Sequence, residues 1–223
     1  DMQEVLHHQL EVLKTGLPEY TVVGVGREDG KTAGEYAPIF FKQAKYTLLD
    51  QNTFWLCEKP DSVGMVGWDA ALTRIATWVK LQDKKTGQIL MVVNTHFDHI
   101  GTEARRNSAL LIIEKIKEIV GTSPAILTGD FNVSEDWDAY KTITNNEFIL
   151  KDAHKVAGKR TGVDFTYHNF GKIPAEKCEK IDFIFVTPQI RVISSYIPFS
   201  QLNDTLFLSD HNPEIVELEI EKS

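Results

Sequence analysis

Five short polar clusters in this chain could together carry out hydrolytic chemistry. They are Gln3-Glu4, Asn94-Thr95-His96-Phe97-Asp98, Gly129-Asp130-Phe131-Asn132, Ile181-Asp182 and Ser209-Asp210-His211. They supply two histidines, several carboxylates and side-chain amides, mostly at the polar ends of apolar runs. Oxygen-rich sets of this kind bind hard divalent cations, so the clusters indicate a site for Mg2+, with Mn2+ or Ca2+ as alternatives. The two cysteines, Cys57 and Cys178, do not have zinc-type spacing.

Two of the clusters follow apolar runs that predict neighbouring strands. Residues 89–93 predict a central strand, and residues 125–127 predict a second buried one. Because side chains alternate along a strand, polar residues spaced two apart share one side of it. They are Asn94, His96 and Asp98 after the first run, and Asp130 and Asn132 after the second. The two strand ends would thus bring Asn94, His96, Asp130 and Asn132 together. Simple turn formation is the alternative for these residue types.

Asp182 begins the apolar segment 181–186 and shares a face with Ile184 and Val186. A carboxylate on an apolar face is costly unless it is paired. His211 is its predicted partner, because an Asp–His pair stabilises the charged imidazole that a general base forms. A surface Asp on an edge strand is the alternative.

Hydrophobic periodicity predicts a few helices among many strands. Helices are expected at residues 5–14 with Gly16 as the cap, at 102–120 capped by Thr102, and at about 137–143 capped by Ser134. Strands are expected at 21–25, 38–41, 46–49, 74–82, 89–95, 124–127, 180–187, 192–197 and 214–220. This order suggests two packed sheets with helices outside them.

Bulk composition narrows the class of protein. The chain has 223 residues, which suits one large domain or two small ones. Its net charge of −8 disfavours tight non-specific binding to duplex DNA, although a local basic patch is compatible with it. No run approaches the roughly 20 apolar residues that span a bilayer. Cysteine usage does not assign a cellular compartment.

Taken in chain order, the five clusters resemble the endonuclease/exonuclease/phosphatase superfamily, which has the DNase I-like fold. The intervening sequence resembles a bacterial branch that is similar to deadenylase-like and sphingomyelinase-like members. That likeness is carried by Gly24-Val25-Gly26-Arg27, Gly34-Glu35-Tyr36, Phe54-Trp55-Leu56 and Gly67-Trp68-Asp69. The resemblance implies an α/β fold, namely a four-layer α/β/β/α sandwich formed by a single domain over residues 1–223.

The resemblance also implies residue roles. Glu4 would be a metal ligand, and Asp210 would help to hold the metal. Asp130 and Asn132 would position the nucleophilic water and the phosphate, and His96 would stabilise the charge that develops on the phosphate or assist the leaving group. His211 would be the general base, oriented by Asp182. Members of the family open with a strand that carries an Asn, so we expect this chain to be N-terminally truncated and to lack that strand.

These observations favour a monomeric, metal-dependent phosphoesterase that hydrolyses a phosphodiester or phosphomonoester. Its substrate is expected to be a small or single-stranded phosphoester. The candidate substrate contacts are Arg27, Trp68, Arg74, Asp98, Arg105 and His168, for which packing or a structural salt bridge is the alternative.

Two other function classes are compatible with the sequence. The first is a catalytically impaired member of the same fold that binds a phosphorylated ligand. The second, a hydrolase with Ser209 as nucleophile, is less favoured because the chain has no Gly-x-Ser-x-Gly elbow.

Overall fold

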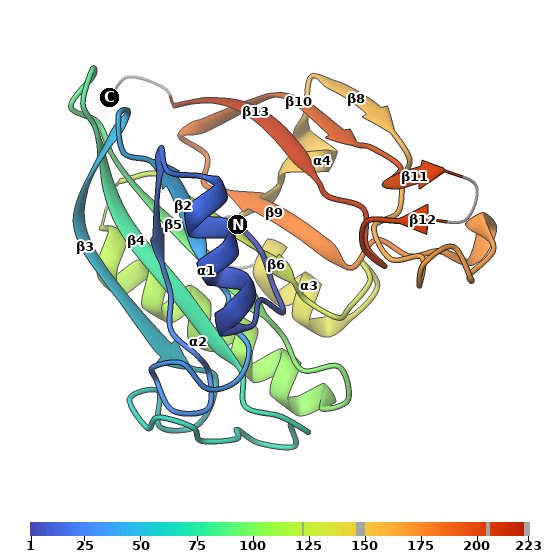
Figure 1. Cartoon of the computed structure of the whole chain (residues 1–223), viewed down its shortest axis with the longest axis horizontal. Coiled ribbons are helices and arrows are strands. Elements are labelled where there is room, and N and C mark those ends of the chain that lie inside the picture. The colour runs from blue at the N-terminus through green and yellow to red at the C-terminus, as the bar shows by residue number, and fades with distance from the viewer. Residues whose placement is uncertain (122, 146–149, 204–205, 221–223) are drawn as a thin grey trace.

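The computed structural model describes residues 1–121, 123–145, 150–203 and 206–220. The largest sheet has six strands in the order β3-β4-β5-β6-β9-β7 (Figure 1). Their bounds are β3 Tyr46–Trp55, β4 Ile75–Asp83, β5 Ile89–His96, β6 Ala125–Asp130, β7 Lys151–Asp152 and β9 Asp182–Val186. β5 and β6 run parallel, whereas the other neighbouring pairs are antiparallel. The sheet order confirms that the apolar run 89–93 forms a central strand.

Smaller sheets and several helices surround the large sheet. The remaining strands are β1 Tyr20–Val23, β2 Ile39–Lys42, β8 Lys159–Gly162, β10 Ile190–Ile197, β11 Gln201–Asn203, β12 Leu206–Phe207 and β13 Ile215–Ile220. They pair as β1-β2, β13-β10-β8 and β11-β12. The helices are α1 His7–Gly16, α2 Thr102–Val120, α3 Asp138–Thr144 and α4 Ala153–Val156, with a 3-10 turn at Ala175–Lys177. Within the described residues, no helix has the length and apolar character needed to cross a membrane.

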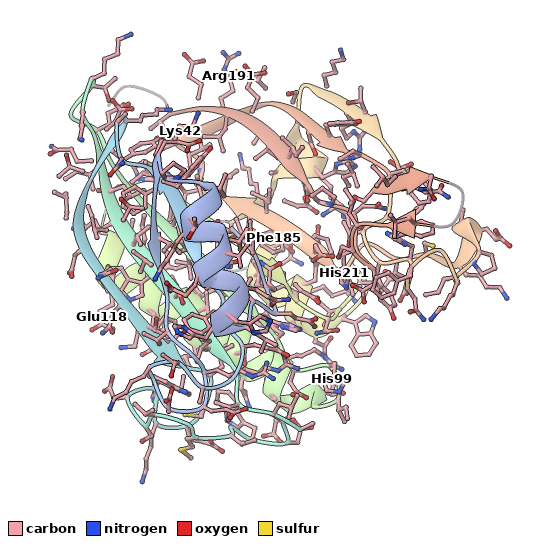
Figure 2. All side chains as sticks on the ribbon, in the orientation of Figure 1. Lys42, His99, Glu118, Phe185, Arg191 and His211 are labelled. Atoms are coloured by element: carbon pink, nitrogen blue, oxygen red, sulfur yellow. The ribbon has the colours of Figure 1, made fainter. Side chains whose placement is uncertain are left out.

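These mixed sheets with helices confirm the predicted α/β class. The four-layer arrangement and the absence of an N-terminal strand remain predictions. Figure 2 shows Phe185 inside the fold and the charged side chains of Lys42, Glu118 and Arg191 at its periphery, in agreement with their burial.

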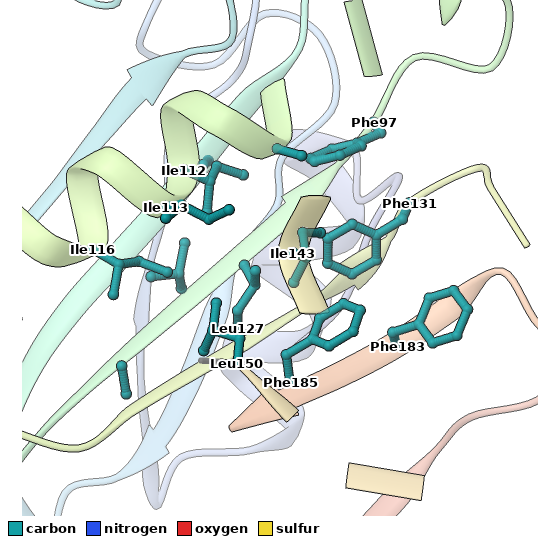
Figure 3. Close-up of a cluster of buried hydrophobic side chains, with 14 of the residues drawn as sticks. Phe97, Ile112, Ile113, Ile116, Leu127, Phe131, Ile143, Leu150, Phe183 and Phe185 are labelled. Atoms are coloured by element: carbon teal, nitrogen blue, oxygen red, sulfur yellow. The ribbon is translucent and has the colours of Figure 1, made fainter. Parts of the chain in front are cut away.

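α2 and α3 cover one face of the six-stranded sheet. Ile112, Ile113 and Ile116 lie on the buried side of α2 and pack in one cluster with Leu127 of β6 and Phe185 of β9 (Figure 3). Full burial of one such side chain contributes about 1.5–3 kcal/mol. The helix is therefore fixed to the strands whose ends carry the polar clusters.

The antiparallel pair β1-β2 packs on the six-stranded sheet through a second hydrophobic cluster. Val23, Ile39 and Phe41 contribute from the small sheet, and Val79 and Leu81 contribute from β4. Successive residues of β4 are buried, as expected for a strand with apolar contacts on both faces.

Some boundaries and caps differ from the sequence-based predictions. α1 begins at His7 instead of residue 5, and β3 continues to Trp55 instead of ending at residue 49. The predicted side-chain caps by Thr102 and Ser134 are wrong, because Gly101 and Trp137 occupy the cap positions without a side-chain cap bond. The predicted cap at Gly16 is also wrong, because that residue ends α1 and Leu17 follows as the C-cap.

The beginning of α2 is instead capped from a distant loop. Asp69 Oδ1 accepts the Ala104 N–H at 2.6 Å, and Asp69 Oδ2 accepts the Glu103 N–H at 3.2 Å. A Cβ atom at Gly101 would lie 2.6 Å from Asp69 Oδ1, so only glycine allows this approach. Because Asp69 lies 34 residues before Glu103, the sequence around the start of α2 does not indicate this cap.

We expect Ile112→Ala to lower the free energy of unfolding by about 2–5 kcal/mol, because Ile112 is fully buried against the sheet. The matched control is Leu110→Ala on the same helix, where the side chain is 47% exposed and the loss should be about 0.5 kcal/mol or less. Urea unfolding followed by circular dichroism measures both values. Equal losses in the two variants would contradict the packing described for α2.

Candidate active site

The ends of β5 and β6 bring three predicted site residues together. Their parallel register pairs His96 with Asp130. Asn132 Nδ2 lies 3.1 Å from His96 Nε2 and donates to Phe97 O at 3.0 Å. Asp130 Oδ1 accepts the Asn132 backbone N–H at 2.8 Å. The predicted meeting of His96, Asp130 and Asn132 is confirmed. Asn132 has a φ of 50°, a left-handed conformation that asparagine tolerates better than most residues.

His211 is paired with the carboxylate that the sequence predicts for it. His211 Nδ1 lies 2.7 Å from Asp182 Oδ2, and His211 Nε2 lies 3.9 Å from Asp130 Oδ2. Burial lowers the pKa of His211. The hydrogen bond and charge of Asp182, together with the charges of Asp130 and Asp210, outweigh burial and raise the pKa to about 9. The Tyr167 ring lies 5.0 Å from the imidazole. The surroundings therefore stabilise the imidazolium form, which a general base produces.

Asp130 joins the two histidines. Its Oδ2 atom lies 3.5 Å from His96 Nε2, and Asp182 stands opposite it in the β6–β9 register. Burial raises the pKa of Asp130, and the charge of Asp182 raises it further. Two carboxylates in one buried place repel each other unless a cation or a shared proton lies between them.

Glu4 and Glu35 also lie close to His96. Glu4 Oε1 lies 3.9 Å from His96 Nε2, and Glu35 Oε2 lies 4.0 Å from His96 Nδ1. An antiparallel bridge between Val5 and Tyr36 holds the two segments together. Sequence reasoning missed Glu35 because it lies in a charged, glycine-rich loop. Its one signal was its place in a tripeptide that carries the family resemblance.

The donor atoms around His96 and His211 fit a hard divalent cation. They converge in two groups, which are Glu4, Glu35 and His96, and Asp130, Asp182 and His211. Burial raises the pKa of Glu4, and the charges of Glu35 and Asp210 raise it further. A divalent cation would relieve this repulsion between carboxylates, and oxygen donors are the ligands that Mg2+, Mn2+ and Ca2+ prefer.

The segment 209–211 gives its three residues different surroundings. Ser209 Oγ accepts the His211 N–H at 3.1 Å and donates to Asp210 Oδ1 at 3.4 Å, so the hydroxyl forms a local turn. Asp210 lines a groove of ≈ 840 Å³ together with Glu4 and His211. Its predicted role as a metal ligand rests on this position. Figure 2 shows His211 to the right of Phe185, which belongs to β9.

Arg27 and Arg74, two of the predicted substrate contacts, place positive charge near His96. Arg27 pairs with Glu35, and Arg74 Nη2 lies 3.0 Å from His99 Nδ1. Burial lowers the pKa of His96 well below its usual value, and the charges of Arg74 and Arg27 lower it further. His96 is therefore held neutral, and its buried Nδ1 has no hydrogen-bond partner among the described residues.

The structure does not bring the other predicted substrate contacts into this cluster. Asp98 is 1% exposed and accepts the N–H groups of Ile100 and Gly101 at 2.9 and 2.8 Å. Arg105 donates to Asp98 O at 2.9 Å. Asp98 and Arg105 thus have structural partners at the start of α2.

His168 and Trp68 also lie outside the two ligand groups. His168 is 1% exposed and packs against the rings of Phe199 and Phe207. The Trp68 backbone N–H donates to Glu58 Oε1 at 3.1 Å. Their predicted contact with substrate remains a prediction.

Asn94 fixes the segment that carries Glu4. Its Oδ1 atom accepts from Gln3 Nε2 at 2.7 Å, and its Nδ2 atom donates to Met2 O at 2.7 Å and to Pro38 O at 3.1 Å. The Asn94 amide therefore holds residues 2–3 and Pro38 in place, and no hydrogen bond among the described residues joins it to His96 or Asp130.

A buried ion pair ties together the two segments that carry Asp182 and His211. Lys180 Nζ lies 2.8 Å from Glu214 Oε2 and donates to Asp182 O at 2.6 Å. The two side chains are 6% and 2% exposed. Ser195 Oγ donates to Glu214 Oε1 at 3.2 Å. The pair therefore fixes the backbone on both sides of the Asp182–His211 hydrogen bond.

Comparisons with known proteins agree with this geometry. The model of the Endonuclease/Exonuclease/phosphatase family matches residues 2–211. An endonuclease/exonuclease/phosphatase from Bacteroides vulgatus is 65% identical, covers 99% of this chain and 84% of its own, and superimposes with a TM-score of 0.96. This likeness identifies the fold as DNase I-like, as the sequence predicts.

Two further relatives cover nearly the whole chain. A mannosyl-6-phosphatase from Bacteroides thetaiotaomicron is 38% identical over 98% of this chain and 84% of its own, with a TM-score of 0.91. An uncharacterized protein of Acanthamoeba polyphaga mimivirus is 30% identical over 94% of this chain and 80% of its own.

We expect Lys180→Met to lower the free energy of unfolding by about 3–5 kcal/mol, because it leaves the Glu214 carboxylate buried without its cation. The double variant Lys180→Met/Glu214→Leu should recover most of this loss, since no uncompensated charge remains. Equilibrium urea unfolding at neutral pH measures both.

The matched control for this pair is Lys115→Met. Lys115 pairs with Glu118 on the surface of α2, and the loss there should be about 0.5 kcal/mol. If Lys180→Met cost no more than Lys115→Met, the buried pair would have no structural role.

Proposed function

This chain belongs to the endonuclease/exonuclease/phosphatase family of phosphoester hydrolases, and on that premise we propose that it is a metal-dependent phosphatase acting on a phosphorylated sugar. The observation that carries the proposal is the convergence of Glu4, Asp130 and the Asp182–His211 pair around His96. The likeness to a mannosyl-6-phosphatase supports a sugar phosphate as the substrate. The net charge of −8 favours such a small substrate over duplex DNA.

A phosphomonoester suits the charges around His96 better than a diester does. A monoester carries about −1.5 to −2 charges at neutral pH, whereas a diester carries one. Arg27 and Arg74 are both buried and both act on His96 electrostatically. Arg27 is paired with Glu35 and Arg74 with Asp98, so these guanidinium groups would offset a dianionic group together with the bound cation.

The cation would be held by Glu4 and Asp210, and a carboxylate oxygen of Glu35 lies within 4.8 Å of one of Glu4. When bound, a divalent cation acts as a Lewis acid on a phosphoryl oxygen. Mg2+ is the metal we propose, because the donors are carboxylate oxygens rather than thiolates.

The remaining steps use side chains of this chain. In its neutral form, His211 accepts a proton at Nε2 from a water molecule, and Asp182 stabilises the resulting imidazolium through its 2.7 Å hydrogen bond. The water oxygen attacks phosphorus in line, and the bond to the sugar oxygen breaks. Asn132 Nδ2 orients the neutral His96 through its contact with Nε2, so that the Nδ1–H of His96 donates to a phosphoryl oxygen. The departing sugar alkoxide takes a proton from solvent water, and His211 returns its proton to solvent, so the sugar alcohol and inorganic phosphate are the products.

We expect the protein to release phosphate from mannose 6-phosphate in the presence of Mg2+, and to lose at least about 100-fold in rate when EDTA removes the metal. Added Mg2+ should restore the rate. Glu4→Gln should need a higher Mg2+ concentration for half-maximal rate, because it removes one ligand charge. Glu11→Gln, an exposed change on α1, should not shift this concentration. Phosphate release that continues unchanged in EDTA would refute the metal-dependent mechanism.

We expect His211→Asn to lower kcat by about 10²–10⁴-fold, the usual contribution of a general base, with KM little changed. The comparison variant is Ser209→Ala. It should retain kcat within about threefold, because the Ser209 hydroxyl forms a local turn. Steady-state phosphate release measures both values. Full activity in His211→Asn, or a collapse in Ser209→Ala with normal folding, would reverse the assignment.

A further inference from the structure

We propose that Trp137 and His99 flank a subsite for the ring of the departing sugar and that this subsite selects cyclic over open-chain phosphomonoesters. The inference rests on the proposed function, because it concerns the leaving group of that reaction. Trp137 is 43% exposed, and His99 is also exposed. Each ring is held by an arginine that is itself buried.

The arginine behind each ring is fixed by the same residue. Arg105 lies 4.8 Å from the centroid of the Trp137 ring and donates to Asp98 O at 2.9 Å. Arg74 lies 3.0 Å from His99 and 3.4 Å from Asp98 Oδ2. Asp98 therefore orients both arginines, and through them both rings.

These two arginines have donor capacity that the protein does not use. Arg74 and Arg105 are only 4% and 3% exposed. Arg74 Nη1 and Arg105 Nε are buried and have no hydrogen-bond partner among the described residues. Burying a cation with an unused donor is costly, so the arrangement suits a ligand that supplies oxygen acceptors. Sugar hydroxyls and phosphate oxygens are such acceptors.

The two rings lie next to the chemistry along the chain. Asp98 follows His96 by two residues, and Trp137 follows Asn132 by five. The charges of Arg74 and His99 both act on His96. The backbone N–H of Trp137 donates to Ser134 O at 3.2 Å, so the loop that leaves Asn132 turns just before the exposed indole. An indole held on one face by a guanidinium can pack its other face on a sugar ring.

The test compares mannose 6-phosphate with the open-chain glycerol 3-phosphate. Trp137→Ala should lower kcat/KM for mannose 6-phosphate about three- to tenfold, mainly through KM, and should change it less than twofold for glycerol 3-phosphate. Trp137→Phe should retain most of the selectivity. The control is Tyr20→Ala, because Tyr20 is also covered by a cation, Lys42 at 5.8 Å, but Lys42 lies at the other end of the molecule from His99 (Figure 2).

A binding measurement separates this inference from the proposed function. Calorimetry of mannose 6-phosphate with the His211→Asn protein should show weaker binding when Trp137→Ala is added. If the wild type hydrolyses neither substrate, the proposed function fails, and the calorimetric comparison alone decides the subsite. Equal losses for both substrates in Trp137→Ala, or unchanged selectivity and binding, would overturn the subsite.

Discussion

Asp130 lies where two strand pairings meet, and the geometry of the active site depends on this position. The β5–β6 register sets His96 opposite Asp130, and the β6–β9 register sets Asp182 opposite it. These three residues form a row across adjacent strands, and His211 joins the row through Asp182. A slip of one residue in either pairing would turn the slipped side chains to the other face of the sheet. The active site therefore exists only in this register.

Aromatic packing on the opposite face stabilises that register. Phe97, Phe131 and Phe183 each directly follow a residue of the row, and alternation turns them into the core beneath α2 and α3. The ring centroids of Phe97 and Phe131 lie 4.9 Å apart, and those of Phe131 and Phe183 lie 6.0 Å apart, both edge to face. Such pairs add about 0.5–1.5 kcal/mol each beyond the burial of their area. Packing of these phenylalanines therefore helps to hold the neighbouring catalytic residues in register.

The sequence predicts those parts of the site that depend on strand periodicity. The meeting of His96 with Asp130 and the Asp182–His211 pair follow from polar residues at the ends of apolar runs. Features that depend on contacts between distant loops carry no comparable signal. Glu35 reaches the site through an isolated bridge between two loops, and the cap of α2 comes from Asp69. The hydrogen-bond partners of Asn94, Asp98 and Lys180 were missed for the same reason. A polar side chain at a strand end can act in catalysis or stabilise the fold. Contacts with distant segments decide between these roles, and the local sequence does not show them.

The division of charge around His96 sets the direction of the proposed reaction. Glu4 and Asp210 bring negative charge close to His211, whereas Arg27 and Arg74 bring positive charge close to His96. In the proposed reaction, His211 activates the water that attacks the phosphate. In-line displacement then sends the leaving alcohol away from His211. The strand register that places Asp130 between His96 and His211 thereby also separates the nucleophile from the leaving group, and this separation is what an in-line phosphoryl transfer requires.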